Sequence, residues 1–264
     1  MKTIQLTKDP YLDFDHRNHR YTYSGMVCES VTTLIKKYSP PFDELKWSAI
    51  KAEQRGVSQG DILAEWKAKA DKASAQGTIV HGEAEKITHQ LKQTKCLSFD
   101  LRDAKHPKVK ALFRWFGANV DMGFGQLFSE FRMVWPEFLV AGTCDLIATN
   151  YQGGNAIIDF KTNEEIDPCG FNNMLAPFTR GKLKLKDCNF TAYALQLTLY
   201  QRILEAKYDF IADSLVIVHL EDSGNYTEYP VHNYRRYVDK ILELKDPNEY
   251  AILVGQESAT STAV

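Results

Sequence analysis

Two short apolar stretches on either side of a turn-rich segment predict a β-hairpin near the middle of the chain. Residues 144–149 read CDLIAT, residues 156–160 read AIIDF, and residues 150–155 between them contain two glycines and two asparagines. Such runs around a glycine-containing turn are typical of paired antiparallel strands. Asp145 lies early in the first run and Asp159 late in the second, so the pairing should bring the two carboxylates roughly opposite each other.

A carboxylate within an apolar strand is costly to bury unless a counter-ion accompanies it. Two carboxylates, completed by waters and phosphate oxygens, suit Mg²⁺ or Mn²⁺ better than zinc. Lys161 follows Asp159 by two residues, which puts both side chains on one face of the strand, where the lysine can orient a water as an ammonium or deprotonate it as an amine. The alternative is a solvated hairpin with an ordinary surface ion pair. The apolar run before Asp159 favours the buried site.

Hydrophobic periodicity in the rest of the chain predicts an α/β fold, with a central mixed sheet flanked by helices and a helical N-terminal elaboration. Helices are predicted over residues 43–55, 61–75, 190–207 and 234–244. Three further helices are predicted to begin at Ser30, Val80 and His106. An N-terminal hairpin is predicted within residues 11–28. Further strands are predicted over residues 126–135, 214–220 and 226–231. Gly77 and Thr78 should separate the helix over 61–75 from the one that starts at Val80.

Several polar residues on these elements are candidates for a site. His81 and Glu85 are four residues apart and share a helix face, although such a pair is commonly a plain hydrogen-bonded pair. Glu130 is a charge in an otherwise apolar strand, and the alternative is that it faces solvent on an edge. Gln196 and Tyr200 share a helix face, where a tyrosine by itself is more often a core residue.

Together these motifs resemble the PD-(D/E)XK nucleases, specifically the RecB-like and phage exonuclease branch. The matching strings are G-T-C-D at 142–145, I-I-D-F-K-T at 157–162, G-T-I-V-H-G-E-A-E at 77–85 and Y-A-L-Q-L-T-L-Y at 193–200. The resemblance covers roughly residues 31–231, and only the combination of motifs makes it specific. It implies a restriction-endonuclease-like core.

The resemblance also implies roles for the matching residues. His81, Asp145, Asp159 and the backbone carbonyl of Phe160 would hold one or two Mg²⁺ or Mn²⁺ ions, while Lys161 positions the attacking water. Glu85 would orient His81 or bind a second ion, and Glu130 would contact a metal or its waters. The remaining matching residues would lie beside the active site or the DNA backbone: Thr162, Gln196 and Tyr200.

Two further segments are candidates for contacts with DNA. Arg180, Lys182, Lys184 and Lys186 alternate along the chain, which would put four charges on one side of an extended segment that tracks a phosphate backbone. A solvated face is the alternative. Ser30 and Thr32 stand at a predicted helix N-terminus, which can bind phosphate, although we favour a plain helix cap.

The length of the chain allows one large domain or two small ones, and we expect one. The 264 residues are 44% hydrophobic and 25% charged, and the net charge of −2 identifies no partner. A nuclease needs only a local basic channel beside its acidic site. We divide the expected domain, residues 1–256, into an N-terminal hairpin and helices (1–76), a catalytic core (77–231) and a C-terminal helix (232–250), followed by a disordered tail (257–264).

Cysteine usage and hydropathy point to a reducing compartment and no membrane. The five cysteines are odd in number and form no C-x-x-C pair, and their spacing does not reproduce the four-cysteine iron–sulfur site of some relatives, so we expect no cluster. No apolar run reaches the length of a membrane span, and the N-terminus lacks the apolar core of a signal peptide. A cytoplasmic protein is expected, in the host cytoplasm if a phage encodes it.

The resulting functional hypothesis is a metal-dependent exonuclease that acts on DNA ends or single strands. By resemblance its setting would be phage-type recombination, replication or repair, with a helicase or recombination protein as a further candidate partner. Two alternatives stay open: a structure-specific endonuclease, and a non-catalytic module that binds DNA ends and retains the nuclease fold.

Overall fold

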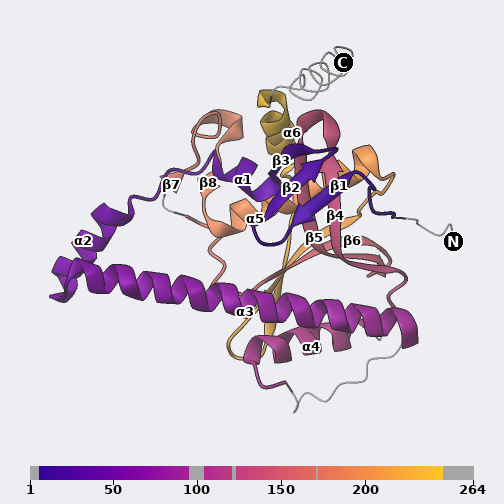
Figure 1. Cartoon of the computed structure of the whole chain (residues 1–264), viewed down its shortest axis with the longest axis horizontal. Helices are drawn as coiled ribbons and strands as arrows, with labels where there is room; N and C mark the ends of the chain where they lie inside the picture. Colours follow the sequence, from indigo (N-terminus) through magenta and orange to yellow (C-terminus); the bar gives the residue numbers. More distant parts are fainter. Residues whose placement is uncertain (1–5, 95–103, 121–122, 171, 246–264) are drawn as a thin grey trace, which may run out of the picture.

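An eight-stranded mixed sheet runs through the centre of the molecule (Figure 1). The computed structural model describes residues 6–94, 104–120, 123–170 and 172–245. The strands pair in the order β1-β2-β3-β5-β6-β9-β10, with β4 on the other edge of β5; their bounds are Leu12–Asp15 (β1), Arg20–Tyr23 (β2), Met26–Ser30 (β3), Leu127–Trp135 (β4), Val140–Tyr151 (β5), Gly154–Lys161 (β6), Ser214–Leu220 (β9) and Tyr226–Pro230 (β10). Parallel pairs (β3–β5, β6–β9) occur beside antiparallel ones, so the predicted α/β fold with a mixed sheet is confirmed.

The predicted central hairpin is confirmed as β5 and β6. Leu146 faces Ile158 in the register, so Asp145 and Asp159 are the next residues along the two strands. Gln152 and Gly153 form the turn with φ angles of 48° and 90°. Positive φ at both positions is the geometry of the tightest hairpin turns, whose twist matches that of the strands.

One edge of β5 is divided between two partners. β3 pairs in parallel with Val140 and Ala141, and β6 pairs antiparallel from Leu146 onward. Within the described pairings, residues 142–145 of β5 have neither β3 nor β6 beside them. This break in the edge lies directly at Asp145.

Helices cover both faces of the sheet. The α5-side core is the buried cluster that α1 (Val31–Lys36), α5 (Asn189–Lys207) and α6 (Arg235–Leu244) form with residues such as Ile157 and Ile217. The α3-side core is the cluster that α3 (Gln59–Thr94) and α4 (Pro107–Val120) form with residues such as Leu146 and Ile158. A third, smaller cluster joins β2 and β3 to the end of β4 and the start of β5.

The prediction of a helix break at Gly77 is wrong, because α3 is one continuous helix of 36 residues. A glycine inside a helix costs only about 1 kcal/mol relative to alanine, so packing readily overrides it. A Cβ at Gly77 would stand 3.7 Å from Oγ1 of Thr162, so the helix passes close to the end of β6 here. The first half of α3, with α2 (Glu44–Arg55), projects from the body of the protein (Figure 1).

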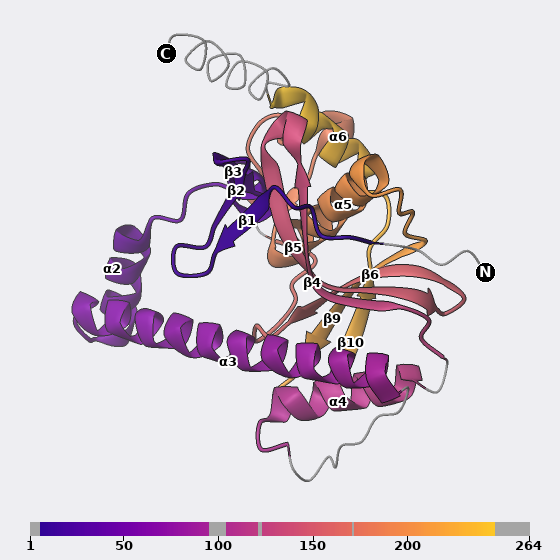
Figure 2. The same ribbon diagram turned by 45° about the vertical axis from the view of Figure 1, so that its right-hand side comes forward.

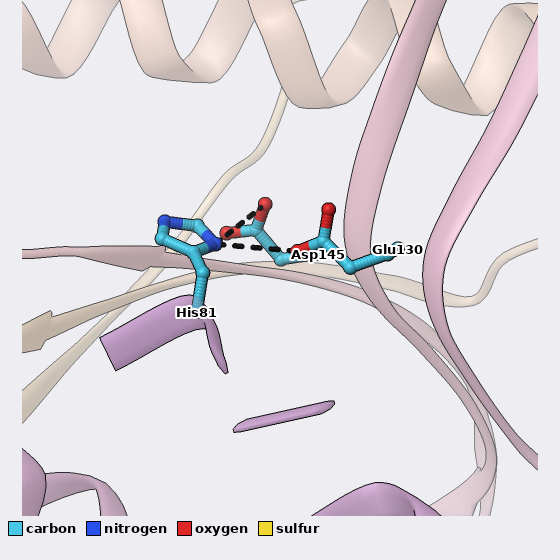
Figure 3. A group of neighbouring side chains, drawn as sticks. All are labelled: His81, Glu130 and Asp145. Atoms are coloured by element: carbon cyan, nitrogen blue, oxygen red, sulfur yellow. Dashed lines mark ion pairs between the residues drawn. The ribbon is translucent and has the colours of Figure 1, made fainter. Parts of the chain in front are cut away.

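The second half of α3 packs on the sheet through the predicted stripe. Val80, Ala84, Ile87 and Leu91 are all buried in the α3-side core. Because this stripe faces the sheet, the side chain of His81, the residue after Val80, points toward the strands (Figure 3). The predicted tail (257–264) and the end of the predicted C-terminal helix lie outside the described residues.

Close packing at Gly142 gives a test of the core. A Cβ there would lie 2.5 Å from Cε1 of Tyr200, whose ring is 3% exposed on α5. We expect Gly142→Ala to lower the free energy of unfolding by about 1–3 kcal/mol, because the buried ring has to move.

Gly117→Ala on α4 is the matched control, since a Cβ at Gly117 meets nothing within 4 Å. This change should stabilise the protein by about 0.5–1 kcal/mol through helix propensity. Urea denaturation of both variants measures the difference, and equal stability of Gly142→Ala and the wild type would contradict the packing described here.

Candidate metal centre

The side-chain alternation of two paired strands changes phase at one place. In β4, Leu127 packs into the α3-side core, whereas Phe131 packs into the α5-side core, although both have odd numbers. In β5, Cys144 belongs to the α5-side core and Leu146 to the α3-side core, although both have even numbers. A regular strand keeps residues two or four apart on one face.

The residues at this change of phase are Glu130 and Asp145. The register continues from Ser129↔Leu146 to Phe131↔Cys144, so neither strand gains a residue and the two acids lie opposite each other. Glu130 has a φ of 48°, in the left-handed region that residues with a Cβ seldom occupy. Strained backbone of this kind concentrates at functional sites.

His81 from α3 completes a cluster with these two acids (Figure 3). Its Nδ1 lies 3.4 Å from Oε1 of Glu130 and 3.5 Å from Oδ1 of Asp145. One potential ligand atom from each of the three residues lies within 4.8 Å of the others. The side chains of His81 and Glu130 are about a third exposed, while that of Asp145 is 11% exposed, so the cluster opens to solvent on one side.

A buried ion pair lies next to this cluster on β6. Nζ of Lys161 is 2.6 Å from Oδ2 of Asp159, with side-chain exposures of 17% and 1%. On α5, the Gln196 amide lies within 3.4 Å of both, and its Nε2 donates to the hydroxyl of Tyr200 at 3.0 Å. The Lys161 ammonium also lies 4.4 Å from the ring centre of Tyr193.

Charge and burial shift the pKa values of this group in consistent directions. The charge of Asp145 is the main cause that raises the pKa of His81 to about 9, and Glu130 adds to it. Burial raises the pKa of Asp145, and it raises that of Asp159 to about 6 against the opposing effect of Lys161. Burial opposes protonation of Lys161, but the carboxylates of Asp159 and Asp145 outweigh it and raise its pKa.

The donor set fits a divalent cation. One imidazole and two carboxylates converge, and a third carboxylate lies beside them. The acids raise the pKa of His81, so a bound cation would take the place of the proton on its imidazole. Carboxylate oxygens suit Mg²⁺ and Mn²⁺, and an imidazole nitrogen suits divalent transition metals. The geometry therefore permits a cation at the point where the three side chains meet.

The structure groups the predicted ligands differently from the sequence. His81 and Asp145 come together, and Glu130, which the resemblance placed beside a metal or its waters, is the third member of the cluster, while Asp159 is held by Lys161. The backbone N–H of Phe160 donates to Oδ2 of Asp145 at 2.8 Å, and the role of its carbonyl stays a prediction. Glu85 is exposed on α3 and lies outside the cluster.

The predicted DNA-contacting residues have mixed placements. Gln196 and Tyr200 adjoin the ion pair, and Thr162 lies just beyond it beside Gly77. Oγ of Ser30 accepts from the backbone N–H of Thr33 and also contacts the hydroxyl of Thr32. The favoured interpretation of Ser30 as a helix cap is therefore confirmed.

The four alternating cations do not lie along one extended segment, and that prediction is wrong. A short 3₁₀ helix, Gly181–Leu183, interrupts the segment, because Gly181 turns the chain with a φ of 68° and Leu185 is buried in the α5-side core. The charged side chains remain exposed: Arg180, Lys182, Lys184 and Lys186.

The pKa of His81 gives a pH-dependent prediction for metal binding. A metal ligand has to be a neutral imidazole, so binding releases the proton that His81 holds below a pH of about 9. Apparent affinity for Mn²⁺ should therefore fall up to about tenfold for each pH unit below that value. Calorimetry at pH 7.5 in buffers of different ionisation enthalpy should detect about one released proton.

His81→Asn should remove this proton release, whereas His89→Asn, at an exposed position on the same helix, should retain it. Equal proton release from the wild type and His81→Asn would show that His81 is not a ligand.

Comparisons with known proteins add little. No known family model matches the chain, and no curated protein matches it. A solved structure described as "Crystal structure of SSO0001" aligns with 67% of this chain and 87% of its own at 13% identity, with a TM-score of 0.28. A likeness this slight informs neither fold nor function. In the described part of the chain, no helix combines the length and apolar character needed to cross a membrane.

Proposed function

We propose that this protein is a metal-dependent phosphodiesterase that cleaves DNA. The observation that carries the proposal is the convergence of His81, Glu130 and Asp145 beside the buried Asp159–Lys161 pair. A site for phosphodiester hydrolysis needs anionic ligands for a cation and a fixed positive charge near the reacting phosphate. Both lie here at one end of the β5–β6 hairpin.

The residues of the site divide into two groups by their chemistry. His81, Glu130 and Asp145 would hold the cation, with Asp145 kept in position by the N–H of Phe160. A bound Mg²⁺ or Mn²⁺ supplies a water of lowered pKa and offsets charge on the phosphate. Asp159 keeps the ammonium of Lys161 at the edge of this group.

Lys161 acts as a fixed charge in this proposal. Its pKa is raised, so the side chain stays protonated at neutral pH and is poorly suited to accept a proton. A protonated ammonium can orient the attacking water and stabilise the charge that develops on the phosphate. Gln196 supports it, because the amide contacts both Lys161 and Asp159.

The resemblance to RecB-like and phage-type nucleases supports exonuclease action on DNA ends or single strands as the finer proposal. It also supports Mg²⁺ or Mn²⁺ as the cofactor and a cytoplasmic setting in recombination, replication or repair. Family likeness alone supports these points, so substrate preference has to be measured.

The test is digestion of end-labelled linear DNA and closed circular DNA, each single- and double-stranded, with Mg²⁺, Mn²⁺ or EDTA. We expect metal-dependent loss of linear DNA only. Cleavage of circles would indicate an endonuclease instead. Binding of DNA without any cleavage would contradict the proposed activity and favour a binding module.

A further inference from the structure

The side chains of the candidate metal centre carry a net negative charge, which a bound divalent cation would offset while it contacts a single phosphate. Three carboxylates, Glu130, Asp145 and Asp159, gather there against the two cations His81 and Lys161. A nucleic acid strand brings further negative charge, so cations outside the centre have to bind its other phosphates. The described surface beside the centre offers such cations on the β1–β2 hairpin.

The tip of this hairpin is rich in exposed basic side chains. Residues 15–20 read DHRNHR, and all of them after Asp15 are exposed. Neither Arg17 nor Arg20 forms an ion pair or side-chain hydrogen bond with any group in the described ranges. Most other described arginines are engaged; Arg55, for example, pairs with Glu65.

The carboxylate at the tip is occupied by the turn itself. Oδ1 of Asp15 accepts from the backbone N–H groups of Arg17 and Asn18, and its Oδ2 accepts from the Asn18 amide at 2.7 Å. These hydrogen bonds lower the pKa of Asp15, and the nearby charge of Arg20 adds to the effect. Asp15 therefore shapes the turn and leaves Arg17 free for a ligand.

Residues at and next to the tip of the hairpin contact the two strands that carry the acids. The guanidinium of Arg132 on β4 lies 5.0 Å from the ring centre of Phe14 and bonds His16 Nε2 at 2.9 Å. On β5, the hydroxyl of Thr143 bonds that of Tyr21 at 2.8 Å. Arg132 and Thr143 face each other in the register.

These anchor points place the hairpin next to the metal centre. Arg132 follows Glu130 by two residues and Thr143 precedes Asp145 by two, a distance of about 7 Å along a strand. Burial is the main cause that raises the pKa of Tyr21, and the charges of Glu130 and Asp145 add to it, which agrees with this proximity. The connection between β1 and β2 lies on the side of the hairpin nearest to α3 (Figures 1 and 2).

We propose that Arg17 and Arg20 on the β1–β2 hairpin bind the phosphate backbone of the substrate strand beside the scissile phosphodiester. This inference rests on the proposed function for the identity of the strand. Arg132 holds the hairpin in place through Phe14 and His16, and thereby positions both arginines. Guanidinium groups form the bidentate contacts that phosphate favours.

The test is a double variant, Arg17→Ala with Arg20→Ala, measured by fluorescence anisotropy on labelled single-stranded and duplex DNA in EDTA. We expect DNA affinity to fall about tenfold or more. Loss of two phosphate contacts should also reduce the slope of log affinity against log salt by about 1.4 for single strands and about 1.8 for duplex. Cleavage at saturating DNA should keep its rate, while KM rises.

Arg235→Ala with Lys240→Ala is the control, because it removes two positive charges from α6, which packs on the α5 side of the sheet. That variant should bind DNA as the wild type does. A third double variant, Arg180→Ala with Lys182→Ala, measures how much the basic segment that the sequence predicted to contact DNA contributes to DNA affinity. A melting temperature for each variant excludes loss of fold.

Wild-type affinity and salt slope in the hairpin variant would overturn the inference. Because binding in EDTA needs no catalysis, the outcome is independent of the nuclease assay. A wild type that does not cleave DNA, with a hairpin variant that loses binding, would contradict only the proposed function.

Discussion

Replacement of Lys161 by alanine is expected to reduce DNA cleavage by roughly 10²–10⁴-fold while the protein stays folded. The reason is the position of the ammonium, 2.6 Å from Asp159 and 17% exposed, where it is the fixed positive charge next to the candidate metal centre. Single-turnover cleavage with saturating metal measures the chemical step, and circular dichroism with thermal melting reports on the fold.

Removal of the lysine leaves Asp159 without its ion-pair partner in a buried place. The pKa of Asp159 is already raised to about 6, so the carboxyl group can take up a proton and the cost to stability is limited. Lys161→Met preserves the length of the apolar stem against Tyr193 and provides a second test in case the alanine variant is unstable.

Lys240→Ala on α6 is the control for loss of a lysine. Lys240 forms a surface ion pair with Glu243 at 2.8 Å, a kind of interaction that contributes at most about 1 kcal/mol. Its activity should equal that of the wild type. Full activity in Lys161→Ala or Lys161→Met would refute the role of Lys161.

The second large effect is expected from Asp145→Asn. Asp145 is the most buried member of the metal centre, and it contacts both His81 and the N–H of Phe160. Loss of outer partners of a metal ligand already weakens metal binding about 10–100-fold, so loss of a direct ligand should weaken Mn²⁺ binding by at least about 100-fold. Calorimetric titration and metal-dependent cleavage measure this loss.

The same variant has a readout that needs no metal. Asp145 is the main cause of the raised pKa of His81, so Asp145→Asn should lower that pKa from about 9 toward the ordinary value of 6.5. Glu130→Gln should lower it too, because Glu130 raises this pKa through both a hydrogen bond and its charge. NMR titration of the His81 ring measures both shifts.

Asp71→Asn on the exposed part of α3 is the control for loss of a carboxylate, since Asp71 pairs only with Lys67 within the described ranges. It should change neither metal affinity nor the titration of His81. Unchanged Mn²⁺ binding in Asp145→Asn would contradict its assignment as a ligand.

Short-range patterns were sufficient to predict most of the secondary structure. The hairpin with Asp145 and Asp159 follows from two apolar runs and a turn, and the stripe from Val80 to Leu91 follows from helical spacing. These features depend on neighbours a few residues away, so the chain itself contains the information. The same reasoning failed at Gly77, where contacts of α3 with distant strands keep one helix intact.

The composition of the site depended on contacts between distant segments. The sequence by itself determined that Asp159 and Lys161 share a face, because residues two apart along a regular strand do. The resemblance had placed Glu130 near a metal, but only the tertiary structure brought it together with His81 and Asp145. β4 and β5 change phase at Glu130 and Asp145, and a change that involves two strands leaves no local pattern in the sequence. Likewise, only packing of Tyr21 and Phe14 on Thr143 and Arg132 brings the basic hairpin beside the site. Local periodicity determines which face a side chain takes, whereas burial across the whole fold decides which faces meet.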